Sequence, residues 1–332
     1  MENRTLGRTG LEVSRLGMGG LFVSSLGTDL DGARQAVRRA AELGVNYVDT
    51  APGYRDSEEV LGHILPGIDQ PLILSTKLGG RPQPFEPQNR DALMASVEES
   101  LRLLRRDHID ILMIHEPDRP GQYDWWTSWH PVEGPVLDLM LDLKKQGLIG
   151  HLGLGGTTAY ELAHIIRSGH FDVVLTAFNY SLLWREAEIE VLPAARAQGM
   201  GIVVGSPLQQ GALAQCYREQ VDDAGVHWLS PARRAQLQAL YALVDEAGMP
   251  LPEMALRFVL GNDDADAVLM GARSEAEVEL NVAAVEKGPL PSDLVARIDE
   301  IAARVPFRPF EEPFGMGGAL RAGRDYRGPG QA

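Results

Sequence analysis

Four side chains that can take part in proton transfer stand close to the ends of short apolar segments of the sequence: Asp49, Tyr54, Lys77 and His115. A phenol is a poor proton donor at neutral pH, because its unperturbed pKa is about 10. An ammonium group beside it favours the phenolate and lowers that pKa, and a carboxylate keeps the ammonium group charged. A neutral histidine can hold a substrate oxygen within reach of the phenol. Together these groups would protonate a carbonyl oxygen, or deprotonate an alcohol, while a hydride moves at carbon.

Each of the four residues also fits a structural role when it is taken alone. Asp49 can cap the turn that follows it, and Tyr54 can be a half-buried loop residue. Lys77 can be a solvated strand end, and His115 can be a hydrogen-bonded core histidine. The catalytic interpretation therefore depends on whether separate elements of the fold bring all four side chains to one place.

The sequence around these residues repeats one unit, an amphipathic helix followed by a glycine and a short apolar strand. Apolar residues at helical spacing occur in segments 33–41, 93–104, 132–143 and 189–195, and an apolar run without polar alternation follows each of them. This pattern is typical of βαβ units around a parallel sheet that is buried on both faces.

The candidate strands number eight and cover residues 15–18, 45–48, 72–76, 109–114, 152–154, 173–176, 202–204 and 267–270. Eight parallel strands predict an α/β protein with one domain over residues 1–332, a closed (β/α)₈ barrel of the TIM type. The carboxyl ends of its strands would meet at one rim, where the four candidates would converge.

Other segments are expected to lie outside the repeated units. Residues 4–6 and 11–14 predict an N-terminal β-hairpin before the barrel. Helices are expected over residues 231–247 and 252–260, in the long gap before the last strand. Residues 307–332 are rich in proline and glycine and lack periodicity, so an irregular tail, either a loop or partly disordered, is expected there.

Composition narrows the class of protein. The net charge of −15 argues against nucleic acid and anionic membrane as partners, since both favour basic patches. Cys216 is the only cysteine, so no intrachain disulfide can form and a reducing compartment is expected. No signal-peptide core or membrane-spanning run occurs in the sequence. These features predict a soluble, cytoplasmic protein.

Five residues close together in the sequence are of types that bind metal ions: His108, Asp110, His115, Glu116 and Asp118. On a strand, Asp110 and His115 would lie about 16 Å apart, at roughly 3.3 Å per residue. Ligands of one zinc ion lie about 2 Å from it, so these two side chains cannot share an ion. No metal site is predicted.

Four segments resemble the aldo-keto reductase family, and the resemblance extends over nearly the whole chain. LGRTGLEVSRLGMGG is similar to the opening hairpin and first strand of the family, and GVNYVDTAPGYRDSEEVLG to its Asp/Tyr signature. LSTKLG resembles the segment with the family's lysine, and HIDILMIHEPD the segment with its histidine. The resemblance implies that Tyr54 is the general acid and base and that Lys77 and Asp49 tune it. It also implies that His115 orients a substrate carbonyl and that a nicotinamide cofactor is used.

The resemblance also implies where the cofactor binds. Gly155 and Gly156 stand where the family has a Ser-Asn pair that contacts the carboxamide, and Gly205 replaces a tyrosine that stacks on the cofactor. Asn179 or Tyr180 can supply compensating contacts. The other implied contacts belong to the pyrophosphate loop and the adenosine end of the site: Ser206, Pro207, Leu208, Gly211, Leu213, Gly271, Arg273, Glu277 and Asn281.

The adenosine end of the implied site favours NADP over NAD. Backbone N–H groups at a helix start suit a phosphate, and Arg273 can pair with a 2′-phosphate or stack on adenine. Glu277 is unfavourable beside a second anion, so NAD stays an alternative. Arg273 also fits as a solvated residue at the start of a helix.

The loop after His115, PDRPGQYDWWTSWHPVEG, contains three tryptophans: Trp125, Trp126 and Trp129. Long loops at this face of a barrel usually form the substrate pocket, and an indole ring can stack on a sugar or an aromatic ligand. The same side chains can instead anchor the loop to the barrel. The segments GLGG and FNYSLL resemble the sugar-dehydrogenase branches of the family, which favours a monosaccharide or glycoside as substrate.

Two other functions stay open at this point. A non-catalytic, nicotinamide-binding regulator on the same barrel would resemble the potassium-channel β subunits, although an intact set of four candidates argues against it. A metal-dependent sugar isomerase or aldolase also uses a similar barrel, and its activity would be sensitive to a chelator and indifferent to nicotinamide.

Overall fold

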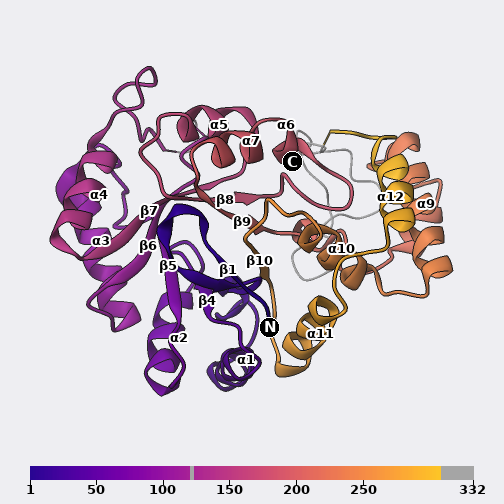
Figure 1. Ribbon diagram of the computed structural model, residues 1–332, viewed down its shortest axis with the longest axis horizontal. Helices are drawn as coiled ribbons and strands as arrows, with labels where there is room; N and C mark the ends of the chain where they lie inside the picture. Colours follow the sequence, from indigo (N-terminus) through magenta and orange to yellow (C-terminus); the bar gives the residue numbers. More distant parts are fainter. Residues whose placement is uncertain (120–122, 308–332) are drawn as a thin grey trace.

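A closed barrel of eight parallel strands forms the centre of the computed structural model, which describes residues 1–119 and 123–307 (Figure 1). The strands are β3 (Leu16–Gly19), β4 (Tyr47–Asp49), β5 (Ile73–Leu78), β6 (Ile109–His115), β7 (Ile149–Gly156), β8 (Val173–Ala177), β9 (Gly201–Gly205) and β10 (Ala267–Met270). They follow one another around the barrel in chain order, and β10 closes the ring by pairing with both β9 and β3. Each of the eight predicted segments is a strand, so the barrel prediction is confirmed.

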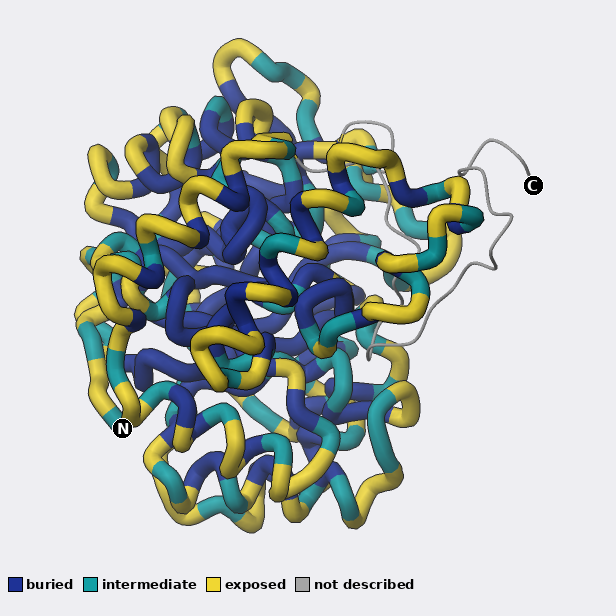
Figure 2. Tube along the Cα trace, turned by 90° about the vertical axis from the view of Figure 1, so that its right-hand side faces the viewer, coloured by how far each residue is buried: buried dark blue, intermediate teal, exposed yellow. Residues whose placement is uncertain are grey.

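Helices cover the outside of the barrel, and the strands are therefore buried on both faces (Figures 1 and 2). The helices are α1 (Leu30–Glu42), α2 (Ser57–Ile64), α3 (Arg90–Leu104), α4 (Pro135–Gln146), α5 (Tyr160–Ile166), α6 (Glu186–Ile189), α7 (Val191–Ala197), α8 (Arg218–Asp222), α9 (Pro231–Ala247), α10 (Leu251–Leu260), α11 (Glu275–Glu286) and α12 (Ser292–Ala302). The helix predicted over residues 231–247 coincides with α9, and the next one begins a residue earlier than predicted. The predicted irregular tail, apart from Phe307, lies outside the described residues.

Two predicted helix segments differ from the structure. Val132 is buried but precedes α4, which begins only at Pro135. The segment 189–195 is not one helix, because α6 and α7 are separated at Glu190, whose φ and ψ are −134° and −44°. Pro193 explains the break: it has no N–H for a bond to the preceding turn, and its ring clashes there.

The predicted N-terminal hairpin, β1 (Asn3–Thr5) and β2 (Glu12–Ser14), packs against the end of the barrel where the strands begin. Its turn contacts the start of β9, and Leu6 belongs to the apolar cluster inside the barrel. A Cβ atom at Gly7 would lie only 2.2 Å from the backbone nitrogen of Gly201, and the φ of Gly7 is +47°. Only glycine permits so close an approach in this conformation.

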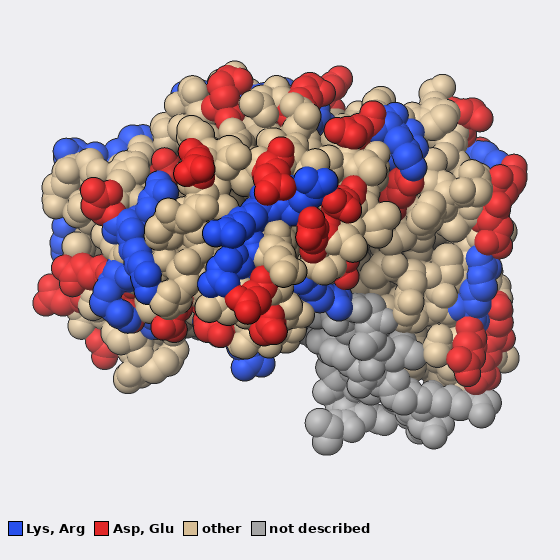
Figure 3. All heavy atoms as spheres, turned by 90° about the horizontal axis from the view of Figure 1, so that it is seen from below, with Lys and Arg blue, Asp and Glu red and all other residues tan. Residues whose placement is uncertain are grey.

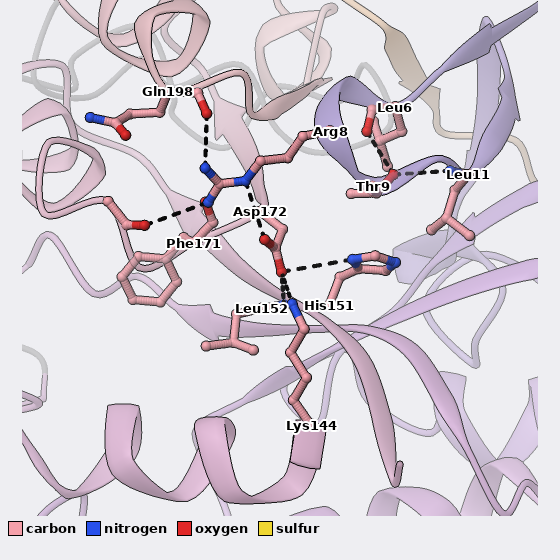
Figure 4. A network of polar contacts seen from close by, with 11 residues as sticks. Leu6, Arg8, Thr9, Leu11, Lys144, His151, Leu152, Phe171, Asp172 and Gln198 are labelled. Carbon is pink, nitrogen blue, oxygen red and sulfur yellow. Dashed lines mark hydrogen bonds and ion pairs between the residues drawn. The ribbon is translucent and has the colours of Figure 1, made fainter.

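A network of charged groups around Asp172 joins this hairpin to the barrel (Figure 4). The Asp172 carboxylate lies 3.3 Å from Arg8 Nε, 2.6 Å from Lys144 Nζ, 3.1 Å from the N–H of Leu152 and 3.7 Å from His151 Nδ1. Burial alone would raise the pKa of Asp172, but the contacts with His151, Lys144 and Leu152 outweigh burial and lower it. The network therefore links the hairpin turn, α4, β7 and the start of β8.

The face of the molecule in Figure 3 shows basic and acidic side chains interspersed, without a large area of one sign. This surface gives no support to a polyanion-binding role for that face.

Within residues 1–119 and 123–307, no helix has both the length and the apolar character needed to cross a membrane.

Replacing Asp172 by Asn should lower the free energy of unfolding at pH 7 by about 1–3 kcal/mol, because two cations lose their partner. The folded-state pKa of Asp172 is lowered, so its contribution is complete above the unfolded pKa of about 3.9 and decreases as the pH falls further. Urea unfolding at pH 7 and pH 3 should show the difference between D172N and wild type shrinking in acid.

The matched control is Asp142→Asn, which removes ion pairs to Arg90 and Lys145 from a side chain that is 43% exposed. That change should alter stability by less than about 0.5 kcal/mol. Equal losses in the two variants, or a difference that does not depend on pH, would contradict the assignment of Asp172 as an anchor.

Candidate active site

The carboxyl ends of β4, β5 and β6 bring three of the four proton-transfer candidates to one rim of the barrel. Asp49 ends β4, Lys77 is the second-last residue of β5, and His115 ends β6. Asp49 pairs in register with Ser75, and Lys77 lies two residues further along the same strand. Since side chains two residues apart on a strand share a face, Ser75 and Lys77 point the same way, toward Asp49.

Tyr54 reaches this rim from the loop between β4 and α2, and hydrogen-bonded turns hold it there. Its N–H donates to the carbonyl of Ala51, and its own carbonyl accepts from the N–H of Ser57, both at 3.0 Å. Ser57 begins α2 and is fixed in turn, because its hydroxyl donates to the carbonyl of Gly20 at 2.7 Å. The signature segment thus positions the phenol through its turn residues as well as through the tyrosine itself.

A fully buried ion pair lies at the base of the rim. Lys77 Nζ is 2.7 Å from Asp49 Oδ2, and the two side chains are 1% and 2% exposed. Lys77 Nζ also donates to the carbonyl of Thr50 at 2.9 Å, and the hydroxyl of Ser75 donates to Asp49 Oδ1 at 2.7 Å. Both carboxylate oxygens are therefore hydrogen-bonded, which offsets part of the cost of burying the charges.

Tyr54 and His115 complete the constellation above this ion pair. Lys77 Nζ lies 4.6 Å from the centroid of the Tyr54 ring. The Tyr54 and His115 rings meet edge to face, with centroids 5.8 Å apart. Elements far apart in the sequence therefore bring together all four residues singled out at the start.

The proton affinities of these groups follow from burial and from the charge of Lys77. Burial lowers the pKa of Lys77, but Asp49 and Tyr54 outweigh it and raise the pKa, so the ammonium group stays charged. Burial and Lys77 together lower the pKa of His115 to about 3, which makes the imidazole neutral at physiological pH.

The pKa of Tyr54 differs from the sequence-based expectation. Part of the residue is exposed, but its hydroxyl is densely surrounded by protein, and this burial raises the pKa. Lys77 lowers it, as predicted, while Asp49 and Glu116 add to the increase. Burial prevails, so the protein alone keeps Tyr54 protonated at neutral pH.

A cavity of about 210 Å³ extends from Asp49 and Tyr54 across the rim to the start of α11. Seven of the predicted cofactor residues line it: Ser206, Pro207, Leu208, Gly211, Gly271, Arg273 and Asn281. Gly205 also lines it, and a Cβ atom there would lie 3.0 Å from Leu175 Cδ2. Glycine at this position leaves room between the end of β9 and the end of β8.

Five predicted cofactor residues do not line this cavity. Gly155 faces the lysine, since a Cβ atom there would lie 3.4 Å from Lys77 Cε, whereas one at Gly156 would face α5 and Asp118. The others are held elsewhere: the Asn179 amide bonds to Thr158 and Thr176, Leu213 is in the core, and the Glu277 carboxylate accepts the N–H of Arg273.

Sequence reasoning missed Phe22, which lines the cavity beside Arg273 and Gly271, at the adenosine end of the predicted site. The Arg273 guanidinium lies over its ring, 4.9 Å from the centroid. The glycine pair Gly19-Gly20 after the first strand was the available signal, because such a turn at the carboxyl end of a barrel strand borders the site.

The three tryptophans of the loop after β6 make contacts that favour the anchoring interpretation. Trp125 is fully buried, with its ring 5.3 Å from that of Phe85. Trp126 Nε1 donates to the carbonyl of Pro117 at 3.0 Å, and the Trp129 ring lies 4.7 Å from that of His164. None of these indoles is among the residues that line the cavity.

The described residues contain no group of three or more His, Cys, Asp or Glu side chains that could hold a metal ion. Asp110, a member of the apparent cluster in the sequence, is used at the other end of β6. Its carboxylate accepts from the N–H of Leu74 and from Arg106.

Comparison with known proteins identifies the family. The family model for the aldo/keto reductase family matches residues 15–303. The chain belongs to the aldo-keto reductase family. It is 29% identical over 295 residues to L-galactose dehydrogenase of Arabidopsis thaliana, covering 86% of this chain and 88% of the relative. It is 28% identical over 324 residues to D-threo-aldose 1-dehydrogenase of a Pseudomonas species, covering 88% and 94%.

A solved structure agrees with this membership. The holo form of an aldo-keto reductase from Bacillus halodurans superposes with a TM-score of 0.75 and 29% sequence identity, and covers 94% of this chain and 100% of that one. This aldo-keto reductase is thus an oxidoreductase of a family that uses a nicotinamide cofactor. The apolar and backbone lining of the cavity, together with Arg273 at its far end, fits such a group.

The neutrality of His115 can be measured directly. Its pKa of about 3 predicts that the imidazole of this aldo-keto reductase stays uncharged down to about pH 4, whereas free histidine titrates near 6.5. Side-chain NMR of ¹³C-histidine-labelled protein should show one resonance that does not shift between pH 8 and pH 5 and that His115→Gln removes. A His115 resonance that titrates like the free histidine standard would overturn the electrostatic account.

Proposed function

We propose that this aldo-keto reductase interconverts a carbonyl group and an alcohol by hydride transfer, with Tyr54 as the general acid and base. The observation that carries the proposal is the buried Asp49–Lys77 pair, whose ammonium nitrogen lies 4.6 Å from the Tyr54 ring centroid at one end of the cavity. Such an arrangement serves a phenol that gains and loses a proton during the reaction.

Each residue has a distinct part in the proposed reaction. For reduction, Tyr54 donates its proton to the carbonyl oxygen, and the positive charge of Lys77 stabilises the phenolate that is left. Asp49 keeps Lys77 charged. The neutral imidazole of His115 donates a hydrogen bond to the substrate oxygen and holds it beside the phenol. A bound nicotinamide cofactor supplies or accepts the hydride.

We further propose NADP, rather than NAD, as the cofactor. Arg273 lines the far end of the cavity, and its buried Nε makes no hydrogen bond within the described part of the chain. A guanidinium with an unused donor can bind a phosphate ester. Glu277, the residue that argued for NAD, already directs one carboxylate oxygen at the N–H of Arg273.

A monosaccharide or glycoside is the proposed substrate class. Two of the similar proteins are named as sugar dehydrogenases, for L-galactose and for D-threo-aldoses. The rim also offers a hydrogen-bond acceptor for hydroxyl groups, because Glu116 follows His115, is 19% exposed and lies close enough to raise the pKa of Tyr54. A carboxylate at this place suits a neutral polyol better than an anionic substrate.

Tyr54→Phe should lower turnover by about 10²–10⁴-fold, because the only proton donor of the proposed mechanism is lost. Binding of NADPH, followed by tryptophan fluorescence, should stay within about threefold of wild type. The assay is nicotinamide absorbance with a panel of aldoses and simple aldehydes in both directions, with Tyr160→Phe, an exposed tyrosine, as the matched control.

Wild-type rates in Y54F would overturn the proposed mechanism. Tight NADPH binding by a wild-type protein that turns over nothing in the panel would instead favour the regulatory alternative. Activity that needs a divalent metal and ignores nicotinamide would favour the isomerase or aldolase.

Arg273→Met should weaken NADPH binding by about 10–100-fold and leave NADH binding unchanged, since a charged hydrogen bond is worth about 1.5–3 kcal/mol. Fluorescence titration with both cofactors measures this. The exposed Arg167→Met is the control. Equal losses for the two cofactors would mean that Arg273 contacts the adenine rather than a 2′-phosphate.

A further inference from the structure

Two buried hydroxyl groups form a chain beneath the Asp49–Lys77 pair. The Tyr47 hydroxyl lies 2.9 Å from Ser75 Oγ, and Ser75 Oγ lies 2.7 Å from Asp49 Oδ1. Tyr47 and Ser75 have no exposed surface, and Asp49 has 1%. The chain therefore runs through the interior of the barrel, where each of these polar groups depends on the next one for its hydrogen bond.

The direction of these hydrogen bonds follows from counting hydrogens. A carboxylate only accepts, so Ser75 must donate its single hydroxyl hydrogen to Asp49. Tyr47 must then donate to Ser75. Burial and the charge of Asp49 raise the pKa of Tyr47 well above its ordinary value, which keeps its proton in place. Both hydrogen bonds therefore point toward Asp49, as does the one from Lys77.

The barrel holds the Tyr47 ring in a defined position. A Cβ atom at Gly17, on the neighbouring strand β3, would lie 2.9 Å from Tyr47 Cδ1, so glycine is needed to make room for the ring. Ser75 is opposite Asp49 in the register of β4 and β5, and Tyr47 lies two residues before Asp49 on the same face. A phenylalanine would fill the same space without the hydroxyl.

We propose that Tyr47 and Ser75 are positioning residues for the reaction: they hold the Asp49 carboxylate in the orientation that binds Lys77 and thereby set how readily Tyr54 releases its proton. This inference rests on the proposed function of Tyr54. It assigns a role to two residues that are not among those lining the cavity.

Loss of the Ser75 hydroxyl should raise the pKa of Tyr54 for two reasons. The hydroxyl dipole, with its hydrogen toward Asp49, offsets part of the negative charge that raises the pKa of Tyr54. The same hydrogen bond fixes the carboxylate that holds Lys77, whose positive charge lowers the pKa of Tyr54. Both effects make the deprotonated form of Tyr54, the one needed to oxidise an alcohol, harder to reach.

The test compares Ser75→Ala, Tyr47→Phe and the double variant with wild type. For L-galactose oxidation with NADP⁺, kcat of S75A should fall about 3–10-fold at pH 7 and approach the wild-type value at high pH. Reduction of glyceraldehyde with NADPH should fall less than oxidation at pH 7, because it starts from protonated Tyr54 and the higher pKa slows only the proton transfer itself. Y47F should show a smaller shift in the same direction, and adding it to S75A should change nothing further, as a serial chain requires.

Two controls keep the result specific to the chain of hydroxyls. Tyr241→Phe removes another buried phenol, on α9, which accepts from the N–H of Tyr217, and its pH profile should match wild type. Ser75→Thr keeps a hydroxyl and should restore the wild-type profile. If S75A fails to fold, Y47F alone carries the test.

A superimposable pH profile for S75A and Y47F would overturn the inference, and so would an equal loss at every pH and in both directions. Failure of the proposed function is separate, because it appears in the wild type as absent turnover or in Y54F as full activity. In that case the absorbance of tyrosinate still tests the inference. The ionisation of Tyr54 is obtained by subtracting the titration of the same protein carrying Y54F, and it should move to higher pH in S75A. An ionisation that does not move would overturn the inference.

Discussion

The ion pair between Asp49 and Lys77 is the interaction on which the arrangement of the rim depends. Removing an ion from water into a protein interior costs several kcal/mol, and a buried pair is often no more stable than two apolar residues of similar volume. Here both side chains are at most 2% exposed, and hydrogen bonds stabilise both charges: the Ser75 hydroxyl donates to Asp49, and Lys77 donates to the Thr50 carbonyl. Because buried pairs in general add little net stability, the effect of these charges on the pKa values of Tyr54 and His115 is the better explanation for this one.

The closed barrel makes such a pair possible, because it separates the requirements of stability from those of chemistry. At the end where the strands begin, Leu6 of the hairpin fills the interior and the Asp172 network fastens the hairpin turn to the barrel. At the other end, the same strands can then carry Asp49, Lys77 and His115, although burying these polar groups lowers the free energy of unfolding. The carboxyl ends of parallel strands lie at one rim. Asp49 and His115, which are 66 positions apart along the chain, therefore become neighbours in space.

The fold and the four rim residues could be predicted because each depends on a local signal. An unalternated apolar run between amphipathic helices has few alternatives to a buried parallel strand, and the residue that ends such a run must lie at the rim. The cavity lining was harder to predict. Gly155 and Gly156 are adjacent in sequence, but alternation along β7 turns one toward Lys77 and the other toward α5. The hydrogen-bonded series from Tyr47 through Ser75 to Asp49 depends on the register between β4 and β5, which cannot be read from the sequence. The tryptophans of the loop after β6 could not be assigned either, because an indole ring suits an anchor and a pocket wall equally well.

The resting state of the phenol has a consequence for the direction of the reaction. Burial outweighs Lys77 and keeps Tyr54 protonated in the protein alone, which is the form that the proposed mechanism needs to protonate a carbonyl oxygen. In the proposed mechanism, oxidation of an alcohol needs the deprotonated form, and the positive charge of Lys77 alone does not produce it at neutral pH. Positive charge added near the ring, such as that of a bound oxidised nicotinamide, would favour the phenolate, while Glu116 opposes it. If the proposed mechanism holds, the balance between these charges, more than the identity of the acid and base, decides how well the same four residues serve each direction.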